Sequence, residues 1–318
     1  MNGHMKRRCR PRREHGLTLA EMLVALTIGL AVVLGAGRLL GLASAAYAAQ
    51  METAAVDDGG RYALDLIGRA VRQAAWADPA GFAGGVAVDP GMLPARLAGL
   101  DARSLNKATA AIDSPLPDAV NGSDVLALRY PGAGPAPNGD GSVLNCAGFA
   151  HAEGEEGWSI FYVARNADGE AELRCKYRGT SSWSADALVT GVDGFQVLYG
   201  VDTDTPRDFV ANRYLNAAAI AALDAALGLG ADVQELNRHT HWKRVVSVRI
   251  GLLLHGARPT RSGTDSLDHD LLGAAYAKSG AAASDTGSSL PETAMPPALR
   301  ARERRLFTAT VALPSALP

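Results

Sequence analysis

The sequence lacks the short motifs that mark the common enzyme classes. In its 318 residues we find no Ser-His-Asp pattern, nucleophile elbow, Walker motif or dinucleotide-binding glycine turn in a suitable context. The glycine-rich run at residues 81–85 follows a helical pattern, whereas a phosphate-binding turn follows a strand, so we interpret it as a linker. We therefore expect neither an enzyme nor a bound cofactor.

Positive charge is scarce beyond residue 16. The first 16 residues hold six of the 31 Lys+Arg and one of the 33 Asp+Glu, which leaves 25 against 32 and a formal net charge of −7 for the rest. Binding to duplex nucleic acid depends on a concentrated positive field. The composition therefore argues against nucleic acid as a partner.

Residues that could bind a metal are also few. Asp202, Asp204 and Asp208 offer oxygen ligands that suit calcium, but the glycine and the distal glutamate of an EF-hand loop are missing at their set positions. His239 and His241 would share one side of a strand approach, and no third ligand follows at a convincing spacing. We expect a solvated acidic loop and no metal site.

What the chain does contain is a basic leader joined to an apolar run. Residues 17–37 are 21 residues whose single charge is Glu21, close to the roughly 20 helical residues that cross about 30 Å of hydrocarbon. A secretory signal peptide would be cut after such a run, whereas here the expected cut lies before it. The leader favours the cytoplasmic side, and its charges are Lys6, Arg7, Arg8, Arg10, Arg12, Arg13 and Glu14.

This junction resembles the class III signal of type IV prepilins. Gly16 is followed by Leu17-Thr18-Leu19-Ala20-Glu21-Met22-Leu23-Val24-Ala25-Leu26, with leucine at position 17 where the family usually has phenylalanine. The resemblance implies that a prepilin peptidase cuts between Gly16 and Leu17 and that Leu17 is N-methylated. Residues 1–16 would then be a cleaved leader.

Glu21 is the charged residue within this apolar run. A carboxylate inside a membrane helix costs a few kcal/mol, so by default it has a function and a partner. Glu21 lies one helical turn after Leu17, and the resemblance implies that it meets the new amino terminus of a neighbouring subunit during assembly. The alternative is a tolerated charge near a helix end.

Cysteine is rare, with three in the chain. Cys9 lies in the leader, which leaves Cys146 and Cys175 for the exported part. An even pair in an oxidising compartment predicts a disulfide. Closing a loop of about 30 residues stabilises the folded state by roughly 3.5 kcal/mol. Two free thiols are the alternative.

The order of the periodic segments predicts an α+β fold. A long helix over residues 17–77 is membrane-spanning over about 17–37 and amphipathic later, where Leu64, Ile67 and Val71 repeat at helical spacing. Beyond it, residues 78–318 form a β-rich periplasmic domain with a short helix at 217–227 and a long loop near 262–297. The expected strands are 124–130, 158–165, 170–177, 194–201, 244–254 and 305–313.

Later blocks narrow the resemblance to the PilW family of type IV minor pilins. They are residues 122–126, 191–204, 245–250 and 304–307, together with the Cys146 and Cys175 pair. The resemblance implies a pilin-like fold, with a long helix packed on an antiparallel sheet. It also implies a single-pass protein of the bacterial inner membrane that enters the pilus after assembly.

The implied function is initiation and assembly of a type IV pilus and its tip complex, supporting adhesion and twitching motility. Expected partners are other minor pilins, the major pilin, the prepilin peptidase, the inner-membrane assembly platform and a tip adhesin. One alternative is a minor pseudopilin of a type II secretion system, which has the same leader and fold. Another is a periplasmic enzyme or binding protein held by an uncleaved signal anchor.

Overall fold

The computed structural model describes residues 16–75, 89–230, 232–261 and 266–313. The chain forms two compact units, Met1–Met51 and Glu52–Pro318. The predictions for residues 1–15 and for the helix end at 76–77 lie outside the described residues.

Helix α1 (Leu19–Ala75) begins in the first unit and ends in the second. In the first unit it is rich in Leu, Ala and Val, and its large apolar side chains are exposed. In the second unit, most of the stripe predicted from helical spacing is buried: Ile67, Val71 and Ala74 have no exposed surface, whereas Leu64 is half-buried. The helix predicted from residue 17 is thus confirmed from Leu19 to Ala75.

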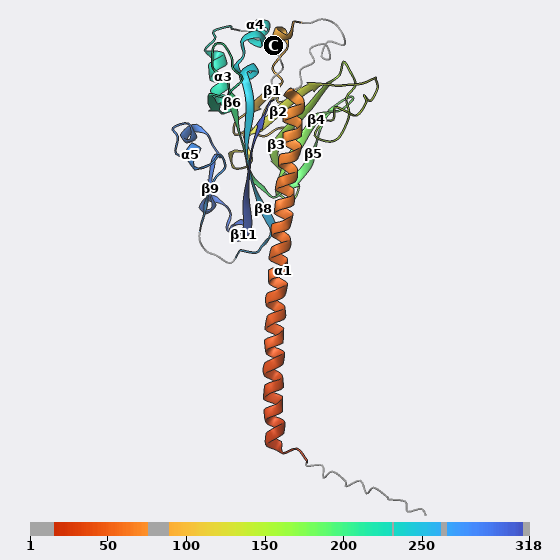
Figure 1. Cartoon of the computed structure of the whole chain (residues 1–318), viewed down its shortest axis with the longest axis vertical. Coiled ribbons are helices and arrows are strands. Elements are labelled where there is room, and N and C mark those ends of the chain that lie inside the picture. The colour runs from red at the N-terminus through yellow and green to blue at the C-terminus, as the bar shows by residue number, and fades with distance from the viewer. Residues whose placement is uncertain (1–15, 76–88, 231, 262–265, 314–318) are drawn as a thin grey trace, which may run out of the picture. The chain divides into compact units, whose positions relative to one another are not determined.

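Five antiparallel strands form the first sheet, in the order β1-β2-β3-β4-β5 (Figure 1). The predicted strands are confirmed as β2, β3 and β4, whereas β1 and β5 were not predicted. The bounds are β1 (Leu97–Leu100), β2 (Val125–Pro131), β3 (Glu156–Arg165), β4 (Ala171–Arg178) and β5 (Trp183–Thr190).

A second antiparallel sheet has the order β11-β8-β6-β7. Three of its strands were predicted, and the short β7 was not. The bounds are β6 (Val192–Val201), β7 (Arg213–Leu215), β8 (Val245–Pro259) and β11 (Arg302–Ala312). Between its strands lie α3 (Ala217–Ala225), which confirms the predicted short helix, α4 (Val233–His239) and the 3-10 turn η3 (His241–Arg244).

The main core lies between α1 and the inner faces of both sheets. It contains Ile67 and Val71 from the helix, Leu173 from β4, Phe195 from β6 and Ile250 from β8. The backbone of α1 approaches β11 closely, because a Cβ added at Gly60 would lie 2.3 Å from the ring of Phe307. A long helix packed on antiparallel sheets confirms the predicted α+β class.

The outer face of the first sheet is also covered. Lys176 of β4 lies on the face opposite Cys175, yet it is fully buried, and its Nζ donates to the backbone oxygen of Asn106 at 2.9 Å. Burial lowers the pKa of Lys176 to about 8. The face is covered because Leu105, Ala111 and Ile112, which are distant in sequence, pack on Ile160 and Tyr162.

The segment 262–297 was predicted to be a loop, but its described part contains short elements. Leu271 and Met295 are buried against Leu253 on the outer face of β8, and they form a third small core. The elements are β9 (Asp268–Asp270), α5 (Ala274–Ala277), η4 (Ala282–Ser284), β10 (Ser289–Pro291), η5 (Glu292–Ala294) and α6 (Pro297–Arg300). The sequence did not predict these elements because they pack on residues distant in sequence, among them Leu253 of β8, Leu306 of β11 and Gln196 of β6.

Candidate functional site in the amino-terminal helix

The three residues predicted for processing and assembly lie at the start of the first unit. Gly16 and Leu17 precede α1, and Leu17 is 80% exposed. Glu21 lies in the first turn of the helix and is exposed. A peptidase could therefore reach the bond between Gly16 and Leu17, and cleavage there leaves an amino group one helical turn from Glu21.

Glu21 and Thr18 form a reciprocal cap at the helix start. The Thr18 backbone N–H and hydroxyl donate to Glu21 Oε2 at 2.9 and 3.0 Å, and the Glu21 backbone N–H donates to Thr18 Oγ1 at 3.3 Å. This is a capping box, which satisfies amide groups that have no intrahelical acceptor. Glu21 Oε1 has no hydrogen-bond partner among the described residues, so the carboxylate can still accept a bond from another molecule.

The capping role of Glu21 was not predicted, although the sequence carries its signal. A threonine followed three residues later by glutamate, before an apolar run, is the usual sequence pattern of a capping box. The cap provides a local reason for a charge at this position. An assembly role for Glu21 remains a prediction and needs a test that separates the two roles.

Beyond Glu21, the first unit presents an apolar surface. The described part of the chain has one helix that is long and apolar enough to cross a membrane, and none of its apolar window is buried. The exposed side chains include Leu23, Leu26, Leu30, Leu34 and Leu40. Such a surface is stable only in lipid or against other apolar helices.

The structure joins Cys146 and Cys175 in a disulfide, with their Cα atoms 5.8 Å apart. Cys175 has no exposed surface and lies on the face of β4 that belongs to the main core. The bond connects β4 to the segment between β2 and β3. The alternative of two free thiols is therefore set aside.

The acidic loop has internal partners for its carboxylates. One oxygen from each of Asp202, Asp204 and Asp208 lies within 4.8 Å of the others. However, Asp202 is buried and accepts the backbone N–H groups of Asp204 and Phe209, both at 2.9 Å. These two bonds explain why the carboxylate of Asp202 is buried without a metal ion. That the loop binds no metal stays a prediction.

The two histidines considered as ligands lie on helices, so the predicted strand approach was wrong. His239 ends α4, and its Nε2 lies 3.4 Å from Glu235. His241 begins η3, and its Nδ1 lies 2.7 Å from Asp224. Each ring therefore contacts its own carboxylate.

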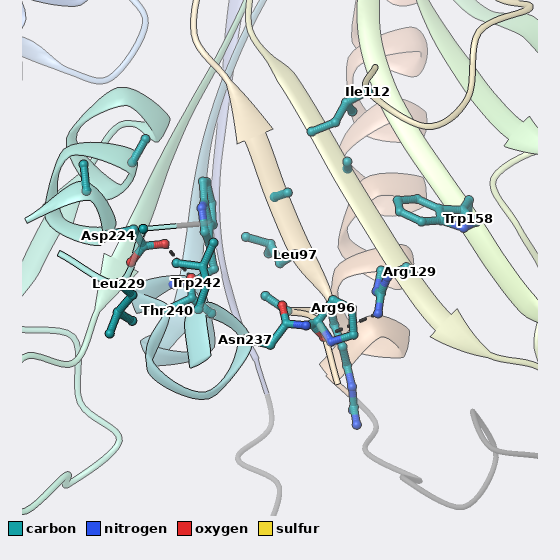
Figure 2. A pocket seen from close by; sticks show the side chains of 18 of the residues that line it. Arg96, Leu97, Ile112, Arg129, Trp158, Asp224, Leu229, Asn237, Thr240 and Trp242 are labelled. Atoms are coloured by element: carbon teal, nitrogen blue, oxygen red, sulfur yellow. Dashed lines mark hydrogen bonds between the residues drawn. The ribbon is translucent and has the colours of Figure 1, made fainter. Parts of the chain in front are cut away.

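A cavity of about 790 Å³ lies between the first sheet and the α3–α4 region (Figure 2). Arg129 and Trp158 lie on its sheet side, and Trp242 lies on the other. Asp224 also lines the cavity, and its carboxylate accepts hydrogen bonds from the Thr240 hydroxyl at 2.5 Å and from the His241 backbone N–H at 2.7 Å. Both bonds hold the start of η3 against the end of α3, so the structure gives Asp224 a local role in joining these two elements.

Comparison with known proteins gives two family matches. The model described as Type IV Pilus-assembly protein W matches residues 160–315, and the one described as Prokaryotic N-terminal methylation motif matches residues 11–37. Among solved structures, the chain is similar to "Type IV-like pilin TTHA1219 from Thermus thermophilus", with 13% identity and a TM-score of 0.29 over 71% of this chain and 89% of that one. No curated protein matches the sequence.

Proposed function

The chain belongs to the type IV pilus-assembly protein W (PilW) family, and from that premise we propose that it is a minor pilin that helps to initiate and assemble a type IV pilus and its tip complex. Through that complex it supports adhesion and twitching motility. Its partners are other minor pilins, the major pilin, the prepilin peptidase, the inner-membrane assembly platform and a tip adhesin.

The observation that carries this proposal is the arrangement at the start of α1. A basic leader, an accessible Gly16–Leu17 bond and an exposed apolar helix occur together, and the methylation-motif match over residues 11–37 includes the end of the leader, the bond and the apolar start of the helix. In the proposed sequence of events, the leader holds the amino terminus in the cytoplasm while the second unit enters the periplasm. The peptidase then releases Leu17, and α1 moves from lipid into the growing filament.

We assign Glu21 the role of binding the amino group of a neighbouring subunit. Its Oε1 has no partner among the described residues, although Oε2 is engaged by Thr18. A buried carboxylate without a counter-charge is costly in an apolar environment, so a neighbour's ammonium group would stabilise the assembled form. The cap and the intermolecular pair use different oxygens, so one residue can serve both.

Two substitutions at this site separate assembly from capping. Glu21→Val removes the carboxylate, while Thr18→Val removes the hydroxyl of the cap and keeps the carboxylate. Each variant is expressed in a deletion strain, and surface pili, twitching and the membrane level of the protein are measured. We expect Glu21→Val to lose piliation at a normal membrane level and Thr18→Val to keep it.

Two results would contradict the assignment. Normal piliation with Glu21→Val would show that the carboxylate is not needed for assembly. Equal loss of piliation with both variants, together with a lowered membrane level, would show that Glu21 acts through the helix cap. Protein export is measured in the same strains, because loss of a pseudopilin of a type II secretion system would leave piliation unchanged and impair export.

A further inference from the structure

The edge strands of the two sheets differ in how well they are protected. β7 has three residues, and β1 has four and contacts α3 and η3. β11 begins with a charged run, Arg302 to Arg305, and such charges discourage strand pairing. β5 is eight residues long and contains no Lys, Arg, Pro or Gly, and its single charge is Asp186.

The backbone of β5 pairs on one side only. Its register runs from Trp183 opposite Arg178 to Thr190 opposite Glu172, all on β4. In an antiparallel pair, alternate residues direct their N–H and C=O groups away from the partner strand, which here gives about four residues. Within residues 16–75, 89–230, 232–261 and 266–313, no strand or hydrogen bond reaches these outward groups. Such an edge can accept a further strand.

A hollow of about 490 Å³ follows this edge on the side of α1. The helix contributes Asp58, Gly59 and Tyr62, and the strand contributes residues 187–190. Tyr62 is 48% exposed, so part of its ring is available for contact. A strand paired with β5 would place alternate side chains beside the hollow, which would add specificity to the backbone bonds.

The charges favour one kind of occupant. Asp58 is the single charged residue that lines the hollow, and Asp186 is the single charged residue of the strand. If β5 paired with β5 of a second copy, these carboxylates would approach one another without a basic residue in either strand, which is destabilising. A segment with Lys or Arg among apolar residues would instead be attracted by the carboxylates of Asp58 and Asp186.

We propose that the outer edge of β5 accepts an extended segment of a different pilin-type subunit, which adds as a sixth strand and directs a basic side chain toward Asp58. This inference rests on the proposed function and names the surface through which the second unit engages its neighbour. Because Tyr62 of α1 is exposed beside the hollow, a subunit bound at β5 would also contact the helix.

Photo-crosslinking in assembling cells tests the proposal with the full-length chain. A photoreactive residue replaces Ala187 at the β5 edge, Thr308 on the β11 edge strand as the matched control, or Leu34 in the apolar part of α1. Adducts are digested, and the linked peptides are identified by mass spectrometry. We expect position 187 to link to a peptide with Lys or Arg from another pilin-type subunit, and position 308 not to link to that peptide.

Two charge reversals on α1 test the role of Asp58. Asp58→Lys should reduce the yield of the position-187 adduct several-fold. Asp65→Lys makes the same change in charge on the same helix, at a carboxylate that does not line the hollow, is 63% exposed and is paired with Arg69. It should leave the yield unchanged.

Each other outcome overturns the proposal. Adducts at position 187 that contain only this chain's own peptides would indicate a second copy. Equal adducts at positions 187 and 308 would indicate contact without strand addition. Adducts at Leu34 but none at position 187 would refute the β5 surface while leaving the minor-pilin assignment intact. A lack of adducts at all three positions would refute that assignment and the inference with it.

Discussion

Glu292 is the centre of a buried ionic cluster that holds the segment 266–297 on the second sheet. Its side chain is 1% exposed, and its two oxygens accept bonds from Arg261 at 2.7 and 2.6 Å. His269 Nε2 lies 3.0 Å away, Leu267 donates its backbone N–H at 3.2 Å, and Arg304 Nη1 lies at 3.7 Å. We predict that Glu292→Gln strongly destabilises this part of the fold, because it removes the buried negative charge that accepts both guanidinium bonds of Arg261 and lies beside His269 and Arg304.

Two estimates of the stability lost in Glu292→Gln agree. The bidentate contact with Arg261, supported by His269 and Leu267, lowers the pKa of Glu292 from 4.5 to about 2. That difference corresponds to about 3 kcal/mol at neutral pH. Removing one partner of a buried ion pair costs about 3–5 kcal/mol in general. We therefore expect a loss of about 3 kcal/mol at pH 7.

The dependence on pH has a definite sign. The folded-state pKa is the lower one, so the stabilisation is present above about pH 4.5 and disappears as the pH falls toward 2. The difference between wild type and Glu292→Gln should therefore shrink over this range. The assay is urea unfolding of the detergent-solubilised chain at several pH values, combined with limited proteolysis of residues 266–297.

Glu303→Gln is the matched control for Glu292→Gln. Glu303 lies on β11 with partial exposure, and the structure records no ion pair for it in the described part of the chain. It should change stability by less than about 0.5 kcal/mol. A loss below about 1 kcal/mol for Glu292→Gln at pH 7, or a loss that is the same at pH 7 and at pH 2.5, would refute the reasoning.

Three other predictions follow from the same structure. Gly60→Ala should lower the urea midpoint of unfolding, because the new Cβ would lie against the ring of Phe307. Gly68→Ala, whose new Cβ has its nearest contact at 3.4 Å, should instead raise the free energy of unfolding by up to about 1 kcal/mol. Urea unfolding compares the two variants, and equal effects would show that β11 shifts to make room for the Cβ at position 60. Cys146 and Cys175 should appear as one linked peptide pair when exported protein is mapped without reductant, and two alkylated thiols in folded material would contradict the disulfide. Gly16→Trp should leave a larger membrane-bound precursor on an immunoblot, and a mature-sized band would exclude processing at this bond.

Regular periodicity explains what the sequence could predict. The buried stripe of α1 repeats at helical spacing, and β4 alternates so that Leu173 and Cys175 share the core face. These patterns are local, so the residues alone predict the element and its buried side. The long helix and six strands were found in this way, whereas the disulfide was predicted from the number of cysteines in the exported part.

The remaining features depend on contacts between distant segments. β5 was missed because its residues lack a clear alternation, and a bulge between Leu173 and Arg174 breaks its register with β4. Lys176 is typical of a solvated face until residues 105–112 cover it. The order of the segment around Glu292 depends on Arg261 and Arg304, which flank it in sequence but carry no local signal of pairing.

The most direct test of the minor-pilin account is mass spectrometry of the amino terminus of this chain, recovered from a sheared filament fraction. The account predicts that the first residue is N-methylated Leu17, with residues 1–16 absent. Recovery of the chain in that fraction with Met1–Gly16 still attached would contradict it.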